Sequence, residues 1–315
     1  MTDSLEVLDH VRLNFTTSGL FFLNIALALI MFGVALDIKI EHFHDILKRP
    51  KSFIMGFISQ TFLLPAFTFF LVLLLNPTPS VALGMILVAA CPGGNISNFI
   101  SSMARANVAL SVSLTAASTS AAIFFTPFNF WLWGSFYINF YNKHSAESLL
   151  RPLEIDKLQM FQTVFILLGI PVIIGLFMAK RFPKITEKIK KPINRGSLLF
   201  FILMVIAMLS ANFSQFTSYV HLVFIIVLLH NGLALATGYF FSKLMKLSHA
   251  DQRTISIETG IQNSGLALAL IFNPKIFPPE LELGGMAIIA AWWGIWHIIS
   301  GLTIAFMWSR RPILA

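Results

Sequence analysis

The fold of this chain is limited most by a series of long apolar segments that are separated by short polar ones. We expect nine such segments, at 17–36, 52–75, 80–103, 107–130, 158–179, 196–212, 218–241, 254–274 and 284–308. A helix needs about 20 apolar residues to cross a bilayer, and backbone groups in lipid must bond within helices or closed barrels. Since the chain is 57% hydrophobic and only 11% charged, the sequence predicts an all-α polytopic membrane protein with nine transmembrane helices.

The basic residues predict the orientation. With the N-terminus outside, 17 of the 22 Lys and Arg residues fall in cytoplasmic loops and the C-terminus. Lys and Arg are retained on the cytoplasmic side of membranes, so the net charge of +8 needs no nucleic acid as partner. We expect a monomeric cell-membrane protein, as in a bacterial inner membrane, with residues 1–16 outside and a cytoplasmic tail at 309–315.

Two of the apolar segments are interrupted by glycine and polar residues. The first contains CPGGNISN at 91–98, and the second contains ETGIQNSG at 258–265. Pro92 cannot donate a helical hydrogen bond and glycine tolerates unusual backbone angles, so each helix should unwind and restart near Asn95 and near Asn263. Paired interruptions in two halves of a chain are typical of the binding site of a secondary transporter.

The two interrupted segments are expected to run in opposite directions. This arrangement fits two inverted five-helix repeats, of which the first lacks its first helix. The first repeat would cover 17–130 and the second 158–308, with an external connection at 131–157.

Glu258 is the residue of this region with the clearest functional meaning. A carboxylate inside a membrane span is costly unless it serves a function. Carboxylate, amide and hydroxyl oxygens are the ligands that a hard cation such as Na⁺ prefers, and the N-terminus of a restarted helix favours an anion. The sequence therefore predicts a cation and an anion at one place, with Na⁺ as the coupling ion and no other cofactor.

Three stretches resemble the bile acid:sodium symporter family. They are CPGGNISN at 91–98, ARANVALSVSLTAAST at 104–119 and ETGIQN at 258–263, and the resemblance extends over 20–308. It implies a ten-helix fold, or nine helices in animal-type members, with a core domain containing two crossed broken helices and a panel domain. It also implies the transport of an organic anion together with two Na⁺ ions.

The resemblance also implies the ligands of both Na⁺ ions. The first ion would be bound by Ser97, Asn98, Ser111, Thr115 and Glu258. The second ion would be bound by the side chains of Gln60, Glu258 and Gln262 and by the backbone carbonyls of Thr259 and Ile261.

The substrate remains open between a bile acid-like molecule and a small carboxylate such as pantoate or a 2-oxo acid. Asn95 follows the glycine pair as in the animal bile acid carriers. In contrast, the stretches NSGLALAL after residue 262 and WHIISG at 296–301 are similar to bacterial members. We predict substrate contacts at Asn95, Asn263 and His297, although a structural hydrogen bond would explain His297 equally well.

Two alternatives compete with sodium coupling. Glu258 could couple transport to protons without Na⁺. Ser264 and His297 could also form the dyad of an intramembrane hydrolase, but the sequence contains no G-x-S-x-G nucleophile motif. We therefore expect a transporter and not an enzyme.

Overall fold

The computed structural model describes residues 17–37, 50–144, 157–211, 213–273, 276–277 and 284–310, together with Leu5 and Leu8. Most of the predicted external N-terminus, residues 145–156 of the predicted connection and residues 311–315 of the predicted tail lie outside this part of the chain. Within it, the regular structure is helical, and one isolated β-bridge joins Gly93 to Gln262.

In the described residues, each predicted apolar segment falls mainly on helices, and two of the segments contain a break. These are α2 (Thr17–Asp37), α4 (Pro50–Ile58), η1 (Ser59–Leu63), α5 (Leu64–Leu75), α6 (Pro79–Ala90), α7 (Ile96–Met103), α8 (Val108–His144), α9 (Lys157–Val164), η2 (Phe165–Gly169), α10 (Ile170–Arg181), α11 (Pro183–Ala211), α12 (Phe213–Leu244), α13 (His249–Gly260), α14 (Ser264–Ile271) and α15 (Gly284–Ser309). Among the described residues, five helical segments are long and apolar enough to cross a membrane: Pro50–Leu75, Val108–Lys143, Leu158–Arg181, Thr217–Leu244 and Gly284–Ser309. The count of nine spans and the inverted repeat stay predictions.

Two predicted helix ends are wrong. Helix α8 does not end near residue 130 but continues to His144, which takes up the first half of the predicted connection at 131–157. Its last turns carry aromatic side chains that pack on the rest of the protein, such as Trp133, whose ring centroid lies 5.3 Å from that of Phe69. This packing stabilises further turns beyond Pro127, which lies inside the helix.

The loop predicted at 180–195 is also mostly helical, because α11 begins at Pro183. Proline favours the first position of a helix, where its missing N–H would have no helical partner. An ion pair of 2.8 Å between Lys190 and Glu187 then supports the exposed first turns, as oppositely charged residues three positions apart do on a helix surface.

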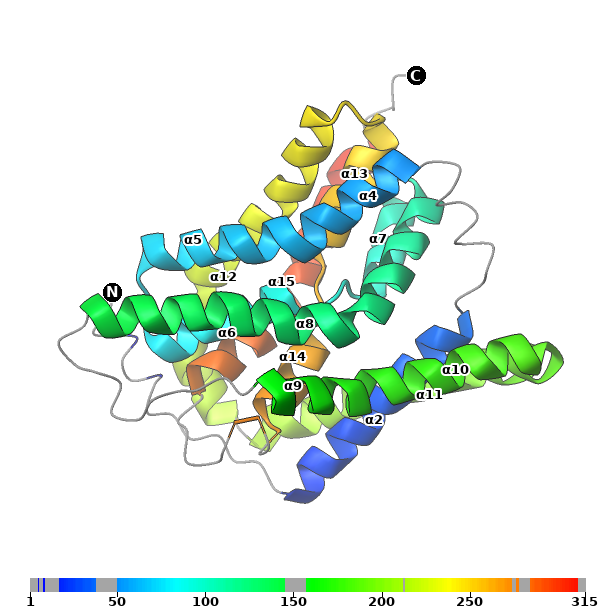
Figure 1. Ribbon diagram of the computed structural model, residues 1–315, viewed down its shortest axis with the longest axis horizontal. Helices are drawn as coiled ribbons and strands as arrows, with labels where there is room; N and C mark the ends of the chain where they lie inside the picture. Colours follow the sequence, from blue (N-terminus) through cyan, green and yellow to red (C-terminus); the bar gives the residue numbers. More distant parts are fainter. Residues whose placement is uncertain are drawn as a thin grey trace.

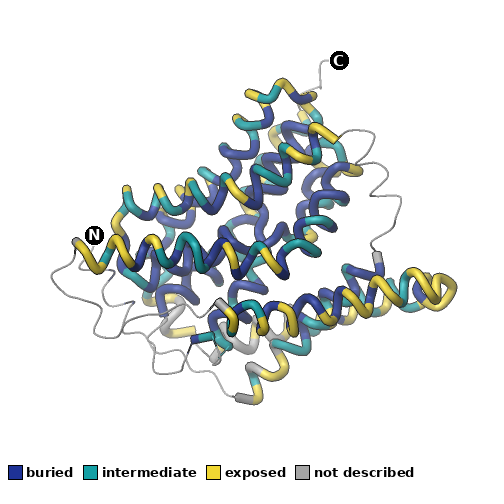
Figure 2. Tube along the Cα trace, viewed as in Figure 1, coloured by how far each residue is buried: buried dark blue, intermediate teal, exposed yellow. Residues whose placement is uncertain are grey.

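The helices form two groups that are visible in Figure 1. Helices α2, α9, α10 and α11 lie together, with α2 packed against both α10 and α11. The other helices form a larger group, whose interior contains most of the buried residues (Figure 2). The groups meet where α8 contacts α9 and where α14 contacts α2.

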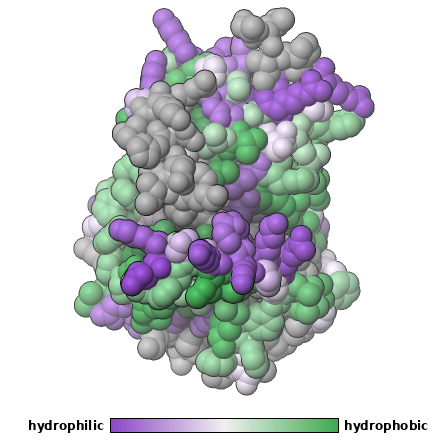
Figure 3. Space-filling model, turned by 90° about the vertical axis from the view of Figure 1, so that its right-hand side faces the viewer, coloured by the Kyte–Doolittle hydropathy of each residue, from purple (hydrophilic) through white to green (hydrophobic). Residues whose placement is uncertain are grey.

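The outer surface carries large apolar side chains, as a membrane protein requires. Phe70 is 59% exposed, Leu74 is 80% exposed and Phe177 is 61% exposed. Exposed apolar surface of this extent is typical of proteins that contact lipid. Hydrophilic side chains instead gather on the side of the molecule that bears the turn between α10 and α11 (Figure 3).

Candidate ion and substrate site

The two interrupted helices cross at their breaks. Helix α6 ends before Cys91 and α13 ends before Ile261, and their unwound backbones pair with each other. The N–H of Gly94 donates to the carbonyl of Ile261 at 2.9 Å, and the N–H of Asn263 donates to the carbonyl of Pro92 at 2.8 Å. Buried backbone groups must find partners, and here each break supplies partners for the other.

Gly93 allows polar side chains to approach the crossing closely. A Cβ atom on Gly93 would lie 2.6 Å from Nε2 of Gln60 and 3.2 Å from Oε2 of Glu258. The position therefore needs a residue without a side chain, because any Cβ would displace one of these groups.

The carboxylate of Glu258 is fully buried within a cluster of hydroxyl groups. It accepts hydrogen bonds from Oγ of Ser97 at 2.6 Å, from Oγ1 of Thr115 at 3.0 Å and from Oγ of Ser111. Oδ1 of Asn98 lies 2.9 Å from the same Ser111 hydroxyl group, whose single proton can serve only one of the two acceptors at a time. The structure thus brings together all five residues that were predicted for the first Na⁺, and their oxygens are of the kind that hard cations bind.

The residues predicted for the second Na⁺ also lie together. Nε2 of Gln60 donates to the carbonyl of Glu258 at 3.2 Å, and Nε2 of Gln262 donates to the carbonyl of Thr259 at 2.7 Å. The amide oxygens of both glutamines are buried and have no partner among the described residues. If the oxygen and nitrogen of either amide group were exchanged, the oxygen would face a backbone carbonyl oxygen, and neither atom could donate a hydrogen bond. The unpartnered atoms are therefore the amide oxygens, which are acceptors.

Two unpartnered acceptors on residues of the same crossing need an explanation, because buried polar groups are nearly always hydrogen-bonded. Amide oxygens of this kind are among the ligands that hard cations bind. The backbone carbonyl of Ile261, the remaining predicted ligand, already accepts one N–H, and a carbonyl oxygen has a second lone pair to offer.

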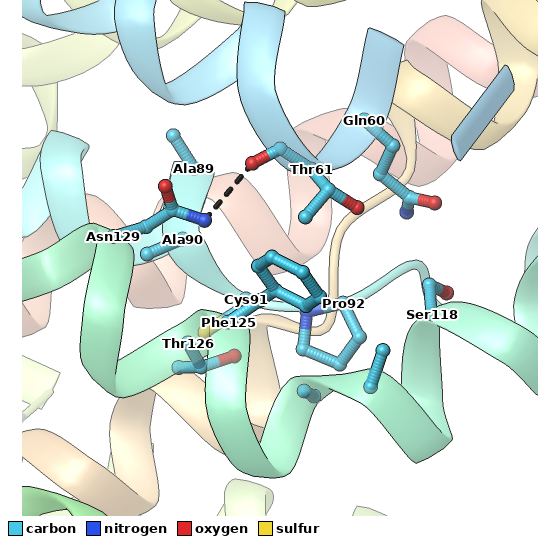
Figure 4. Close-up of a pocket in the computed structure, with 12 residues that line it drawn as sticks. Gln60, Thr61, Ala89, Ala90, Cys91, Pro92, Ser118, Phe125, Thr126 and Asn129 are labelled. Carbon is cyan, nitrogen blue, oxygen red and sulfur yellow. Dashed lines mark hydrogen bonds between the residues drawn. The ribbon is translucent and has the colours of Figure 1, made fainter. Parts of the chain in front are cut away.

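A single π-helical turn, η1, places Gln60 at the crossing. Pro65 has no N–H, so the carbonyl of Thr61 loses the donor that an α-helix would provide four residues later. The side chain of Asn129 on α8 donates to this carbonyl at 2.9 Å (Figure 4). Isolated π-turns of this kind are frequent at functional sites.

A small pocket lies beside this turn, between η1, α8 and the end of α6. Gln60, Cys91 and Ser118 line it, as Figure 4 shows. Gln60, whose amide oxygen is unpartnered among the described residues, is therefore one of the residues that border this pocket.

Asn95 and Asn263 occupy equivalent places, each at the N-terminal end of a restarted helix. Oδ1 of Asn263 accepts a hydrogen bond from the N–H of Leu266 at 3.0 Å and so caps α14. Helix N-termini carry partial positive charge and free N–H groups, so both ends suit an anion.

His297 and Ser264 are not joined to this arrangement by hydrogen bonds. His297 is buried on α15, and its Nδ1 has no partner among the described residues. A Cβ on Gly294 would lie 2.7 Å from Oγ of Ser264, so Ser264 faces α15, but no hydrogen bond joins it to His297 in the described part of the chain. The dyad of a hydrolase is therefore not assembled.

The sequence alone did not indicate the residues that hold the broken helix α13. The side chain of Asn231 on α12 donates to the carbonyl of Gly260 at 2.8 Å, and Oγ of Ser300 donates to Oδ1 of Asn231 at 2.5 Å. Ser59 and Thr259 share a hydrogen bond of 2.9 Å between their hydroxyl oxygens. A lone amide in an apolar helix is a signal that it has a partner, but the partner cannot be read from the sequence.

Comparisons with known proteins identify the family of this chain. Residues 24–219 match the sodium bile acid symporter family. The chain is 30% identical to an uncharacterized sodium-dependent transporter of Bacillus subtilis, over 98% of this chain and 91% of the relative. It is 31% identical to a chloroplast protein of Arabidopsis thaliana named as a probable sodium/metabolite cotransporter, over 91% of this chain and 66% of that one.

A more distant relative is sodium/bile acid cotransporter 4 of Homo sapiens, with 27% identity over 84% of this chain and 58% of the human protein. The chain thus spans about two thirds or less of these plant and human relatives. All three relatives are named as transporters, and none is named as an enzyme. The family match covers more than half of the chain, and this protein therefore belongs to the sodium bile acid symporter family.

Proposed function

We propose that this protein is a secondary active transporter that carries Na⁺ and an organic anion together across a cell membrane. The observation that carries the proposal is the buried carboxylate of Glu258, which lies among hydroxyl groups at the crossing that also holds two unpartnered amide oxygens, those of Gln60 and Gln262. The relatives support it, since they are named as sodium-dependent, sodium/metabolite and sodium/bile acid transporters.

Two Na⁺ ions bind on either side of Glu258 in this proposal. The first takes the oxygens of Ser97, Asn98, Ser111, Thr115 and Glu258. The second takes those of Gln60, Gln262 and Glu258 and the backbone carbonyls of Thr259 and Ile261. Because one carboxylate serves both sites, filling one site orders a ligand of the other, which makes binding of the two ions cooperative.

The anionic group of the substrate binds at the crossing, near Asn95 and Asn263. Support comes from the two helix N-termini that meet there, since their N–H groups favour negative charge. The substrate is a bile acid-like molecule or a small carboxylate.

Transport proceeds by alternating access between the two groups of helices. The group that contains the crossing acts as the core domain, and α2, α9, α10 and α11 act as the panel domain. The hydrophilic side with the α10–α11 turn (Figure 3) faces the cytoplasm, because seven Lys and Arg residues lie at 180–195 and such residues stay on that side.

Proton coupling through Glu258 is the second candidate, and the neutral donors around this carboxylate favour it. Ser97, Ser111 and Thr115 would also hydrogen-bond to a protonated carboxyl group. The two unpartnered amide oxygens remain unexplained in that case, which is why we prefer Na⁺.

A thermal-unfolding screen of small carboxylates tests the proposal. A ligand that binds only the folded state raises the unfolding temperature by mass action. We expect Na⁺ to raise it when K⁺ at the same ionic strength does not, and one class of carboxylate to raise it further only in Na⁺. An unfolding temperature that responds to pH but is identical in Na⁺ and K⁺ would instead support proton coupling.

A further inference from the structure

A second buried carboxylate lies at the beginning of α13. Asp251 is 3% exposed. Its Oδ1 accepts a hydrogen bond from Nδ2 of Asn107 at 2.7 Å, and its Oδ2 accepts one from Oγ of Ser52 at 2.8 Å. Asp251 therefore joins α13 to the residue before α8 and to α4.

Asn107 forms hydrogen bonds with both α8 and α13. Its Oδ1 accepts from the N–H of Leu110 at 3.1 Å, which caps the first turn of α8. Its carbonyl accepts from Oγ1 of Thr254 on α13 at 3.0 Å. The beginning of α8 is thus attached to α13 at two points, through Asp251 and through Thr254.

The same part of α13 also holds α7. Nη1 of Arg253 donates to the carbonyl of Ala104 at 2.9 Å, at the C-terminal end of α7, where a basic side chain is favourable. Both helices that supply hydroxyl groups to Glu258 are therefore fixed to the first two turns of α13.

The spacing connects these contacts to the ion site. Asp251 and Glu258 are seven residues apart on α13, which places them two turns apart on one face. Asn107, Ser111 and Thr115 follow one another at intervals of four along the chain into α8, so they also share a face. The two helices are consequently joined twice, by Asp251 with Asn107 and by Glu258 with Ser111 and Thr115.

We propose that Asp251 is a positioning residue for the ion site, which holds α8 in register with α13 so that Ser111 and Thr115 reach Glu258. The inference rests on the proposed function, since the affected quantity is Na⁺ affinity. Groups that orient the ligands of a metal change its affinity by about 10- to 100-fold when they are lost. We therefore expect Asp251→Ala to raise the half-saturating Na⁺ concentration about tenfold or more.

The measurement is the unfolding temperature of the purified protein as a function of Na⁺ concentration, with K⁺ keeping the ionic strength constant. A residue that only stabilises the fold lowers the unfolding temperature equally at all Na⁺ concentrations and leaves the half-saturating concentration unchanged. Gln252→Ala is the matched control, because Gln252 is buried in the same turn but donates to the carbonyl of Leu247 instead of to α8.

An exchange of the two side chains separates position from charge. Asn107→Asp alone sets two carboxylates against each other, which repel, and should weaken Na⁺ binding. Asp251→Asn alone keeps an acceptor for Asn107 and should have a smaller effect. The double variant Asp251→Asn/Asn107→Asp restores one amide and one carboxylate with their roles exchanged, and it should recover most of the parental Na⁺ affinity.

Three outcomes decide the question. Weak Na⁺ binding in Asn107→Asp that recovers in the double variant supports the inference, including where Asp251→Ala does not yield folded protein. A half-saturating Na⁺ concentration equal to that of the parent in Asp251→Ala or in Asn107→Asp overturns it and leaves the proposed function intact. If the parent itself shows no difference between Na⁺ and K⁺, the proposed function fails instead.

Discussion

Glu258 combines complete burial with hydrogen bonds from neutral donors only. Serine and threonine hydroxyl groups contact its oxygens, and among the described residues no basic side chain bonds to it. A buried carboxylate without a positive partner is expensive. A Na⁺ ion would supply the missing charge, and the unpartnered oxygens of Gln60 and Gln262 would complete its surroundings.

Glu258→Gln tests the role of this charge. The variant keeps an oxygen ligand but removes the negative charge, so we expect the half-saturating Na⁺ concentration to rise about tenfold or more, since cation affinity follows ligand charge. Accumulation of substrate in liposomes against its gradient should be abolished. Both are measured on reconstituted protein, and undiminished Na⁺ binding would remove the carboxylate from the ion sites.

Gly93→Ala tests the close approach of Gln60 to the crossing. The added Cβ would lie 2.6 Å from Nε2 of Gln60, so Gln60 must move and the second Na⁺ should bind about tenfold more weakly. Gly94→Ala is the matched control, because the nearest atoms to its Cβ would be the backbone of Gln262 at 3.3 Å and Cγ2 of Ile261 at 3.6 Å instead of the side chain of Gln60. Sodium titrations of unfolding temperature compare the two, and equal effects would argue against a special role of Gly93.

At the scale of helices, the crossing is held mainly by backbone hydrogen bonds. The unwound segments around Gly94 and Ile261 pair with each other, and Asn231 on α12 fixes the end of α13. The restarted helices α7 and α14 begin next to this pairing. Their N-termini are therefore presented together, which is the basis for placing the anionic group there.

Asn263 has two roles at this scale, and two substitutions separate them. Asn263→Ser keeps a side chain that can cap α14, whereas Asn263→Ala loses the cap and should cost about 1 kcal/mol of stability. If the amide contacts the substrate, both variants weaken substrate binding while Na⁺ affinity stays near that of the parent. Thermal unfolding and substrate-uptake kinetics are the measurements. Parental uptake kinetics in both variants would contradict the placement of the substrate.

For the whole molecule, the two groups of helices have different roles in our proposal: the larger group binds the ions, and the smaller group does not. The hydrogen bonds described at the ion site all involve the larger group, whereas α2, α9, α10 and α11 contribute apolar surface and a basic turn. Relative motion of the groups would then expose the crossing to one side of the membrane at a time. The ligands of the ion site would keep their positions relative to one another during this motion.

Asn24→Leu tests this division. Asn24 is a half-buried residue of α2, and its replacement should leave the half-saturating Na⁺ concentration unchanged, because α2 supplies no ion ligand in our proposal. Sodium titrations of the variant and the parent provide the comparison. A large loss of Na⁺ affinity would place α2 in the ion site.

Transport is expected to be electrogenic. In our proposal Glu258 stays with the protein, so a cycle that carries two Na⁺ ions and one monovalent anion would move a net charge of +1. One elementary charge is worth about 2.3 kcal/mol per 100 mV, so an inside-negative potential should drive accumulation. The dependence of uptake on the membrane potential is measured in liposomes with a potassium diffusion potential at fixed Na⁺ concentration. Uptake of a monovalent anion at a rate independent of the potential would exclude a ratio of two Na⁺ ions to one substrate.

The amino-acid sequence by itself determined the class of this protein and the location of its breaks. Apolar segments of about 20 residues leave the backbone no alternative to helices in lipid. Pro92 with Gly93 and Gly94 makes an interruption unavoidable at a known position. The family motifs indicated which side chains to expect at the ion site, including Gln60, whose place no pattern in the sequence would have suggested.

Only the tertiary structure decided which groups meet. Gly94 pairs with Ile261, Asn129 bonds to Thr61, and Asn231 bonds to Gly260, and in each case the two residues are far apart in the chain. The packing of distant segments also leaves the amide oxygens of Gln60 and Gln262 without a partner among the described residues. Helix ends also escaped prediction, since packing of aromatic residues extends α8 to His144. The local amino-acid sequence predicts whether a segment forms a helix or a break. The partner of a buried polar group depends instead on how distant segments pack against each other.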